Sequence, residues 1–261
     1  NVRLILEGVN YKANIWLNGE MVADYKQIEG AFKISDLNVT PQLVEGVNVL
    51  AVEIIPPKKG DLTIGFVDWN PTPPDLNMGM WRGAYLKLTG SVSANEIFVQ
   101  TDVNTETLEE ADLNISTVLV NHADEDKVVE LKGKIGEVLF SKSYEVRANS
   151  SLDVNITSKD VAELHIESPK LWWPVNLGDP NLYTLELDVI VDGEISDQQS
   201  TRFGIREVKQ YVNDEGHKGF MVNGHKVLIR GGGWVDDMLL ADSDEKVRAQ
   251  VEYTKYMNLN T

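Results

Sequence analysis

Apolar and polar residues alternate with a period of two from residue 2 to residue 57, which is typical of half-buried β-strands, and one more such run follows a long loop. The alternating runs lie at residues 2–7, 14–17, 20–23, 32–34, 47–55 and 84–88. Asn18-Gly19 separates two of these runs and is the strongest short signal for a β-hairpin. Because no helical pattern separates the runs, they predict an antiparallel sandwich of the jelly-roll kind.

A jelly-roll sandwich needs roughly eight strands, which is more than these runs supply. The first residues, Asn1-Val2-Arg3, already read as part of a strand, with no initiator Met and no signal segment. We therefore expect residues 1–90 to be part of a truncated jelly-roll domain, and the chain to be a segment of a larger protein.

A second series of alternating runs follows a junction at Gly90-Ser91-Val92. These runs lie at residues 96–99, 111–120, 128–135, 152–156 and 183–191. Turn residues recur about every ten positions, which predicts an immunoglobulin-like β-sandwich over residues 91–206. Trp172 and Trp173 fall within this segment, and we interpret them as core and domain-interface packing because adjacent side chains of an extended segment point to opposite faces.

The pattern changes after residue 206. Asn223-Gly224 predicts a hairpin, and the apolar run 227–229 predicts a strand buried on both faces. A glycine-rich turn, 231–233, follows it, and a helix is expected from an N-cap at Asp242 to Met257. Strand, turn and helix make one β/α unit over residues 207–261, and one such unit cannot close a barrel of eight.

Residues 65–82 form a long loop between two predicted strands. The loop contains Pro71, Pro73 and Pro74, which forbid both a helix and a central strand, together with Trp69 and Trp81. A loop of this length with this aromatic content is either a structural plug at the end of the sandwich or a sugar site. In a sugar site the indole face stacks on a pyranose while Asp and Asn oxygens accept its hydroxyl hydrogen bonds.

Composition limits the partners. The chain has 261 residues, of which 42% are hydrophobic and 25% charged, and its formal net charge is −17. This negative charge disfavours nucleic acid as a partner. There is no cysteine, which excludes disulfides and thiolate metal sites, and no apolar run approaches the roughly 18 residues of a membrane-spanning helix.

Few residue patterns indicate chemistry. His122, His165, His217 and His225 are scattered without the spacing of a triad or a metal site. Asp236-Asp237 is a carboxylate pair beside a strong motif, but sequence neighbours on a loop are usually solvated or capping. The tripled glycine lacks the spacing of a dinucleotide loop, and no Ser sits in a nucleophile elbow. We therefore expect no cofactor and no metal.

Four stretches together carry a resemblance. The chain resembles glycoside hydrolase family 2, most closely its exo-β-glucosaminidase and β-mannosidase branch. The matching stretches, which span nearly the whole chain in the family's order, are Asn10 to Gly19, Asp68 to Arg82, Pro169 to Pro174 and Arg230 to Trp234.

This resemblance implies a sugar-binding function for the jelly-roll domain and identifies residues 207–261 as the first unit of a (β/α)8 catalytic barrel. It implies a retaining exo-glycosidase acting on a carbohydrate with a terminal β-linked mannose, glucosamine or galactose, secreted or periplasmic. Both catalytic glutamates lie on later barrel strands, so no catalytic residue is expected in this chain. A carbohydrate-binding or adhesion module without hydrolase activity is the alternative.

The resemblance also implies substrate-binding residues. Asp68 and Trp69 match a first-domain loop that contacts the terminal sugar, while Trp234 and Asp237 match residues at the barrel rim. The sequence departs from the β-mannosidase branch at Phe66-Val67, where a Trp is usual, and its Asn70-Pro71 is similar to the glucosaminidase branch. The identity of the sugar therefore stays open.

Overall fold

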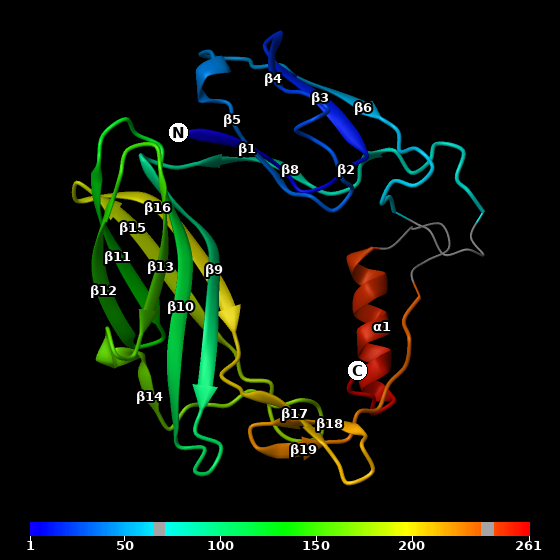
Figure 1. Ribbon diagram of the computed structural model, residues 1–261, viewed down its shortest axis with the longest axis vertical. Coiled ribbons are helices and arrows are strands. Elements are labelled where there is room, and N and C mark those ends of the chain that lie inside the picture. Colours follow the sequence, from blue (N-terminus) through cyan, green and yellow to red (C-terminus); the bar gives the residue numbers. More distant parts are fainter. Residues whose placement is uncertain (65–70, 236–242) are drawn as a thin grey trace. The chain divides into compact units, whose positions relative to one another are not determined.

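The computed structural model describes residues 1–64, 71–235 and 243–261 (Figure 1). The chain divides into two compact units, the first within residues 1–89 and the second from residue 90 onward. Strands dominate both units, which confirms the prediction of a mainly β protein. No helix in the described residues is long and apolar enough to cross a membrane.

The first unit contains small antiparallel sheets. One has the strand order β5-β1-β8 and another the order β4-β3-β6, while β2 pairs with β7. The strands are β1 (Val2–Leu6), β2 (Val9–Asn10), β3 (Lys12–Leu17), β4 (Glu20–Ala23), β5 (Ser35–Asn38), β6 (Leu50–Ile55), β7 (Gly79–Met80) and β8 (Ala84–Leu88). A short 3₁₀ helix, η1 (Thr40–Gln42), follows β5.

Buried side chains, among them Leu6 of β1, Ile15 of β3 and Val39 just after β5, form a small core. The hairpin predicted at Asn18-Gly19 is confirmed, and both turn residues have positive φ, at 52° and 85°. The strand expected at residues 32–34 is wrong, because β5 begins only at Ser35. Phe32 instead contacts the Trp81 indole edge to face, with ring centroids 5.3 Å apart.

The second unit contains a β-sandwich. One sheet joins β9 (Val92–Val103), β10 (Glu110–Asn121), β13 (Ser151–Thr157) and β14 (His165–Glu167). The other has the order β12-β11-β15-β16, formed by Val138–Val146, Lys127–Ile135, Tyr183–Val191 and Glu194–Phe203. Buried side chains from both sheets, among them Ile115, Leu131 and Leu187, form one continuous core. A 3₁₀ helix, η2 (Ala162–Leu164), connects β13 to β14.

The last segment has a separate small sheet, β17 (Val208–Val212), β18 (Lys218–Val222) and β19 (His225–Val227). The turn predicted at Asn223-Gly224 is confirmed between β18 and β19. The strand expected at residues 227–229 is wrong: β19 ends at Val227, and Leu228 and Ile229 are 75% and 48% exposed. No neighbouring strand in the described residues pairs with them, so burial on both faces is not achieved.

The predicted C-terminal helix is confirmed as α1 (Asp244–Tyr256). Its N-cap is Ser243, whose hydroxyl accepts a hydrogen bond from the Lys246 backbone N–H at 3.2 Å. The expected cap, Asp242, lies outside the described residues. No residue of α1 is buried, and its apolar side chains Val251, Tyr253 and Tyr256 are exposed.

Candidate functional site

The candidate site is the loop between β6 and β8 in the first unit. Asp68 and Trp69, the loop residues expected to contact a sugar, lie outside the described residues. The structure does describe both flanks of that segment, at residues 56–64 and 71–83. These flanks show what holds the loop in place.

Trp81 anchors the C-terminal flank. Its backbone N–H donates to the Gly8 carbonyl at 3.2 Å, and its indole N–H donates to the Ala31 carbonyl at 2.6 Å. The guanidinium of Arg82 lies 4.3 Å from the indole ring centroid, within cation–π range. The indole packs so closely on Gly8 that a Cβ there would lie 2.6 Å from its Nε1. Trp81 therefore holds the loop to the connecting segments at Gly8 and Ala31 rather than offering a face to a ligand.

Asn10 joins the two flanks. It is fully buried, and its side-chain oxygen accepts a hydrogen bond from the Thr63 hydroxyl at 2.9 Å. Its amide nitrogen donates to the carbonyls of Asn77 at 2.8 Å and of Leu76 at 3.4 Å. The sequence did not indicate this role, since Asn10 stands out there only as part of the stretch from Asn10 to Gly19. No local signal could have found it, because the Thr63 hydroxyl is 53 residues away in the chain.

Tight turns shape the C-terminal flank itself. The Leu76 N–H donates to the Pro73 carbonyl and the Met78 N–H to the Asp75 carbonyl, each at 3.0 Å. The Asp75 carboxylate accepts a hydrogen bond from the Asn77 backbone N–H at 3.0 Å. Asp75 thus serves the loop's own turn.

Of the two expected barrel-rim residues, Trp234 is described, and it belongs to the second unit. Trp234 is 63% exposed, so its indole face is open to a partner. Asp237 lies outside the described residues, as does its neighbour Asp236.

Trp172 and Trp173 pack as the sequence predicts. The Arg206 guanidinium lies 4.2 Å from the Trp172 ring centroid, and the ring of Trp173 meets that of His225 edge to face at 5.2 Å. The buried side chain of Asn223 donates to the Trp172 carbonyl at 3.0 Å. The paired tryptophans therefore connect the sandwich to the β17–β19 sheet.

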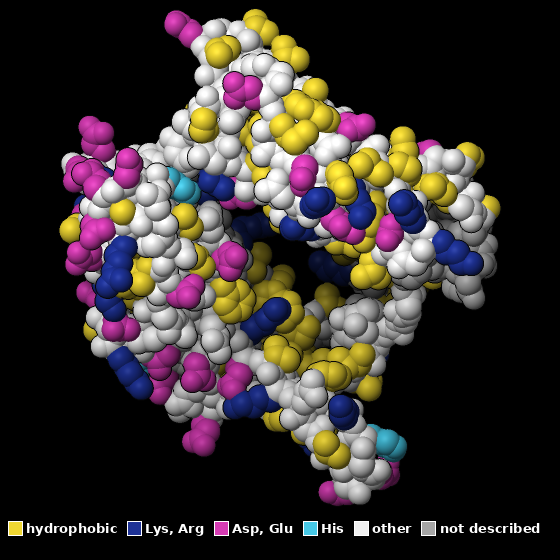
Figure 2. Space-filling view, turned by 45° about the horizontal axis from the view of Figure 1, so that its top comes forward, with side chains coloured by type: hydrophobic (Ala, Val, Ile, Leu, Met, Phe, Trp, Pro, Cys, Tyr) yellow, Lys and Arg dark blue, Asp and Glu magenta, His cyan; other side chains and the backbone are white. Residues whose placement is uncertain are grey.

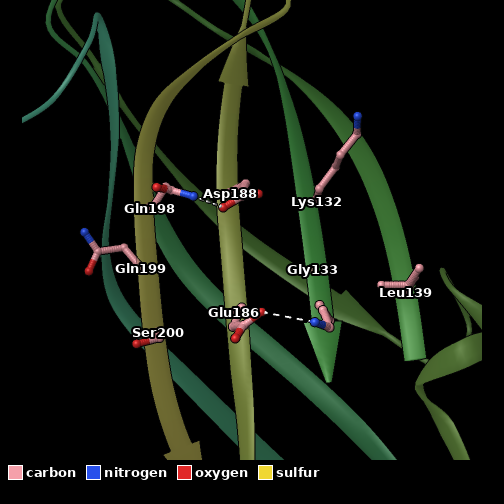
Figure 3. A pocket seen from close by; sticks show the side chains of 9 residues that line it. Lys132, Gly133, Leu139, Glu186, Asp188, Gln198, Gln199 and Ser200 are labelled. Carbon is pink, nitrogen blue, oxygen red and sulfur yellow. Dashed lines mark hydrogen bonds and ion pairs between the residues drawn. The ribbon is translucent and has the colours of Figure 1, made fainter. Parts of the chain in front are cut away.

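A shallow trough of about 510 Å³ crosses the outer face of the second sheet of the sandwich (Figure 3). Asp188 accepts a hydrogen bond from the Gln198 side-chain amide at 2.8 Å, and Lys134 lies 3.7 Å from Glu186. These groups pair with one another across neighbouring strands, as is usual for a solvated sheet face. The trough offers polar contacts but no activated nucleophile.

Three histidines have polar partners, and one of them, His217, lies 3.3 Å from the exposed Glu215. The Ser93 hydroxyl lies 2.9 Å from His122 Nε2, but Ser93 is only 1% exposed and cannot meet a substrate. His165 lies 3.1 Å from Asp112 and 3.7 Å from Glu110, and the Asp112 hydrogen bond raises the pKa of His165. In the described residues, no cluster of His, Asp and Glu has the arrangement of a metal site.

Comparisons with known proteins agree on one family. The family model described as "Glycosyl hydrolases family 2" matches residues 92–206. An exo-beta-D-glucosaminidase of Streptomyces avermitilis is 34% identical over 260 residues, which cover 99% of this chain and 29% of that protein. A mannosylglycoprotein endo-beta-mannosidase of Lilium longiflorum is 27% identical over 294 residues, which cover 100% of this chain and 30% of that protein.

The solved structure of the Amycolatopsis orientalis exo-chitosanase CsxA superposes with a TM-score of 0.91. Its sequence is 31% identical, and the match covers 99% of this chain and 30% of that one. The chain therefore spans less than a third of the length of these relatives.

Proposed function

Because this chain belongs to glycoside hydrolase family 2, we propose that it forms the non-catalytic, substrate-positioning portion of a retaining exo-glycosidase. The observation that carries the proposal is the similarity to exo-β-D-glucosaminidases, which extends over 99% of the chain at 34% identity. A module used only for binding or adhesion would have no reason to match glycosidases across every segment.

We divide the chain into a partial sugar-binding jelly-roll domain at residues 1–90, an immunoglobulin-like sandwich at 91–206 and the start of the catalytic barrel at 207–261. The family match over residues 92–206 supports the middle segment. The uncovered apolar side chains of Leu228, Ile229 and α1 support the last one, since a barrel would bury them.

Catalysis belongs to the remainder of the enzyme. Retaining hydrolysis requires two carboxyl groups about 5 Å apart, one as acid/base and one as nucleophile. The family resemblance assigns both to glutamates on later barrel strands, so this chain contributes substrate contacts. We assign Asp68 and Trp69 to the terminal sugar and Trp234 and Asp237 to the barrel rim.

Glucosamine is the substrate class that we favour. Identity to the exo-β-D-glucosaminidase is 34%, against 27% to the endo-β-mannosidase and 26% to a β-galactosidase of Priestia megaterium. Charge supports the same choice, because the amine of glucosamine is protonated near neutral pH while this chain has a net charge of −17. Asp and Glu side chains spread across the surface visible in Figure 2.

The test is a panel of aryl β-glycosides given to the longer enzyme that contains this chain. We expect turnover of the β-glucosaminide to exceed that of the β-mannoside and the β-galactoside. Asp68→Ala should lower kcat/KM roughly ten- to a hundredfold, because it removes a charge-assisted hydrogen bond to the transition state. The Tm should change little. Binding of oligosaccharides without turnover of any glycoside would favour the non-catalytic module instead.

A further inference from the structure

We propose that Asn10 is a positioning residue that fixes both flanks of the loop carrying Asp68 and Trp69. The proposal rests on the sugar-contact role assigned above to that loop. Asn10 lies far from these residues in the sequence, and its side-chain hydrogen bonds reach the loop's described flanks, so it would act on the substrate through the loop.

The hydrogen bonds of Asn10 connect both sides of the segment 65–70. Thr63, which precedes the segment, donates to the Asn10 side-chain oxygen at 2.9 Å. Leu76 and Asn77, which follow it, accept from the Asn10 amide nitrogen at 3.4 and 2.8 Å. The Asn77 side chain adds a direct link by donating to the Ile64 carbonyl at 3.4 Å. The buried Asn10 amide therefore joins the two ends of the loop, at Thr63 and Asn77.

The chemistry of these partners fixes the orientation of the amide. The Leu76 and Asn77 carbonyls can only accept, so the amide nitrogen must face them, whereas the Thr63 hydroxyl can donate to the oxygen. A carboxylate at this position would place an oxygen, which can only accept, against the Leu76 and Asn77 carbonyl oxygens, and these hydrogen bonds would be lost. Asn10→Asp should therefore release the loop although it preserves the size of the side chain.

Asn10 is also linked to the C-terminal flank through its backbone. It lies in β2 opposite Gly79 of β7, and its neighbour Val9 lies opposite Met80. The Asn10 side chain is completely buried, so water does not compete for its hydrogen bonds. The backbone pairing with β7 and the side-chain bonds to both flanks restrict the conformations of these flanks, because closing the ends of a loop removes chain entropy before a substrate arrives.

Asn48 provides a matched control. It is also an Asn of the first unit with several hydrogen bonds: its oxygen accepts from the Val44 N–H at 2.9 Å, and its amide donates to the Val44 and Gly46 carbonyls at 2.9 and 3.1 Å. These bonds hold a different turn. Asn48→Ala should therefore reproduce a loss of stability without affecting the loop at 65–70.

The first experiment measures hydrogen exchange on the 261-residue chain. We expect Asn10→Ala and Asn10→Asp to speed exchange in the flanking residues 60–64 and 71–80, and Asn48→Ala to leave these flanks unchanged. Unchanged exchange in both Asn10 variants, or an equal rise in the Asn48 variant, overturns the proposal. This readout does not depend on any activity, so its failure is separate from failure of the proposed function.

The second experiment is a double-mutant cycle in the longer enzyme. Asn10→Ala should lower kcat/KM about tenfold, which corresponds to about 1.4 kcal/mol of transition-state stabilisation. If Asn10 acts through Asp68, the double variant with Asp68→Ala should be no worse than the poorer single variant. Fully additive losses overturn the proposal. If Asp68→Ala alone has no effect while the exchange result holds, the proposed sugar contact is wrong and Asn10 still fixes the loop.

Discussion

Residues Gly8 to Asn10 form the base on which the proposed sugar loop is built. Gly8 accepts the Trp81 backbone N–H and leaves room for its indole, while Asn10 joins the flanks at Thr63 and Asn77. The proline-rich loop could be predicted from sequence because its signals are local. The partners of Asn10 could not, since they are separated from it by more than 50 residues.

His165 illustrates how a single charged pair contributes to stability. It lies opposite Asp112 across the β10–β14 ladder, and their hydrogen bond raises the pKa of His165. Hydrogen bonds from Ser158 and His165 lower the pKa of Asp112, so the two groups favour their charged forms. Because the side chains are partly exposed, the pair should contribute less than about 1 kcal/mol.

The sign of its pH dependence follows from the raised pKa. Stability from His165 is fully present below the unfolded pKa of about 6.5 and is lost as pH rises through the higher folded pKa. We expect His165→Gln to lower Tm at pH 5.5 and to have almost no effect at pH 9. In an Asp112→Asn background this pH dependence should shrink. A Tm difference that is the same at both pH values would exclude the charged pair as its cause.

Among the elements, strands with alternating burial were predicted, whereas two strands with polar residues at inward positions, β12 and β16, were missed. β12 was missed because Lys142 occupies an inward position and reaches Asp160 at 2.8 Å. β16 was missed because it buries Ser196 and Asp197. These two accept hydrogen bonds from the backbone N–H groups of Val92 and Ala94 at 2.9 Å, and so join the edges of the two sheets.

Gly133 in β11 tests the packing of the sandwich. It lies directly opposite Phe140 of β12, and a Cβ at Gly133 would overlap the Phe140 ring. Gly133→Ala should therefore destabilise the sandwich by about 1–3 kcal/mol through overpacking, measured by denaturant unfolding. Lys134→Ala, an outward change on the same strand, should cost under about 1 kcal/mol.

Replacing the Phe140 ring with the smaller leucine side chain should relieve this clash. We expect Gly133→Ala combined with Phe140→Leu to be less destabilised than the sum of the two single changes. Equal costs for Gly133→Ala and Lys134→Ala would contradict the contact on which this prediction depends.

At the scale of the whole molecule, similarity to glycosidases runs from end to end of the chain, whereas the described residues show no catalytic arrangement. The exposed Leu228 and Ile229 differ from the buried strand expected from sequence, and the proposed barrel would account for this, because parallel strands are buried only when their neighbours are present. The apolar run 227–229 predicts a buried segment, but the described residues do not supply the neighbours that would bury it.

In the proposed function, this chain positions substrate for catalytic groups located elsewhere in the enzyme. The most direct measurement compares turnover of an aryl β-glucosaminide by the purified 261-residue chain with turnover by the longer enzyme, both prepared in the same way. We predict hydrolysis with retention of configuration by the longer enzyme and none by the 261-residue chain, because two carboxyl groups about 5 Å apart are required. If the 261-residue chain alone hydrolyses the glycoside, and this activity copurifies with the chain through successive columns, the proposed division of roles is wrong.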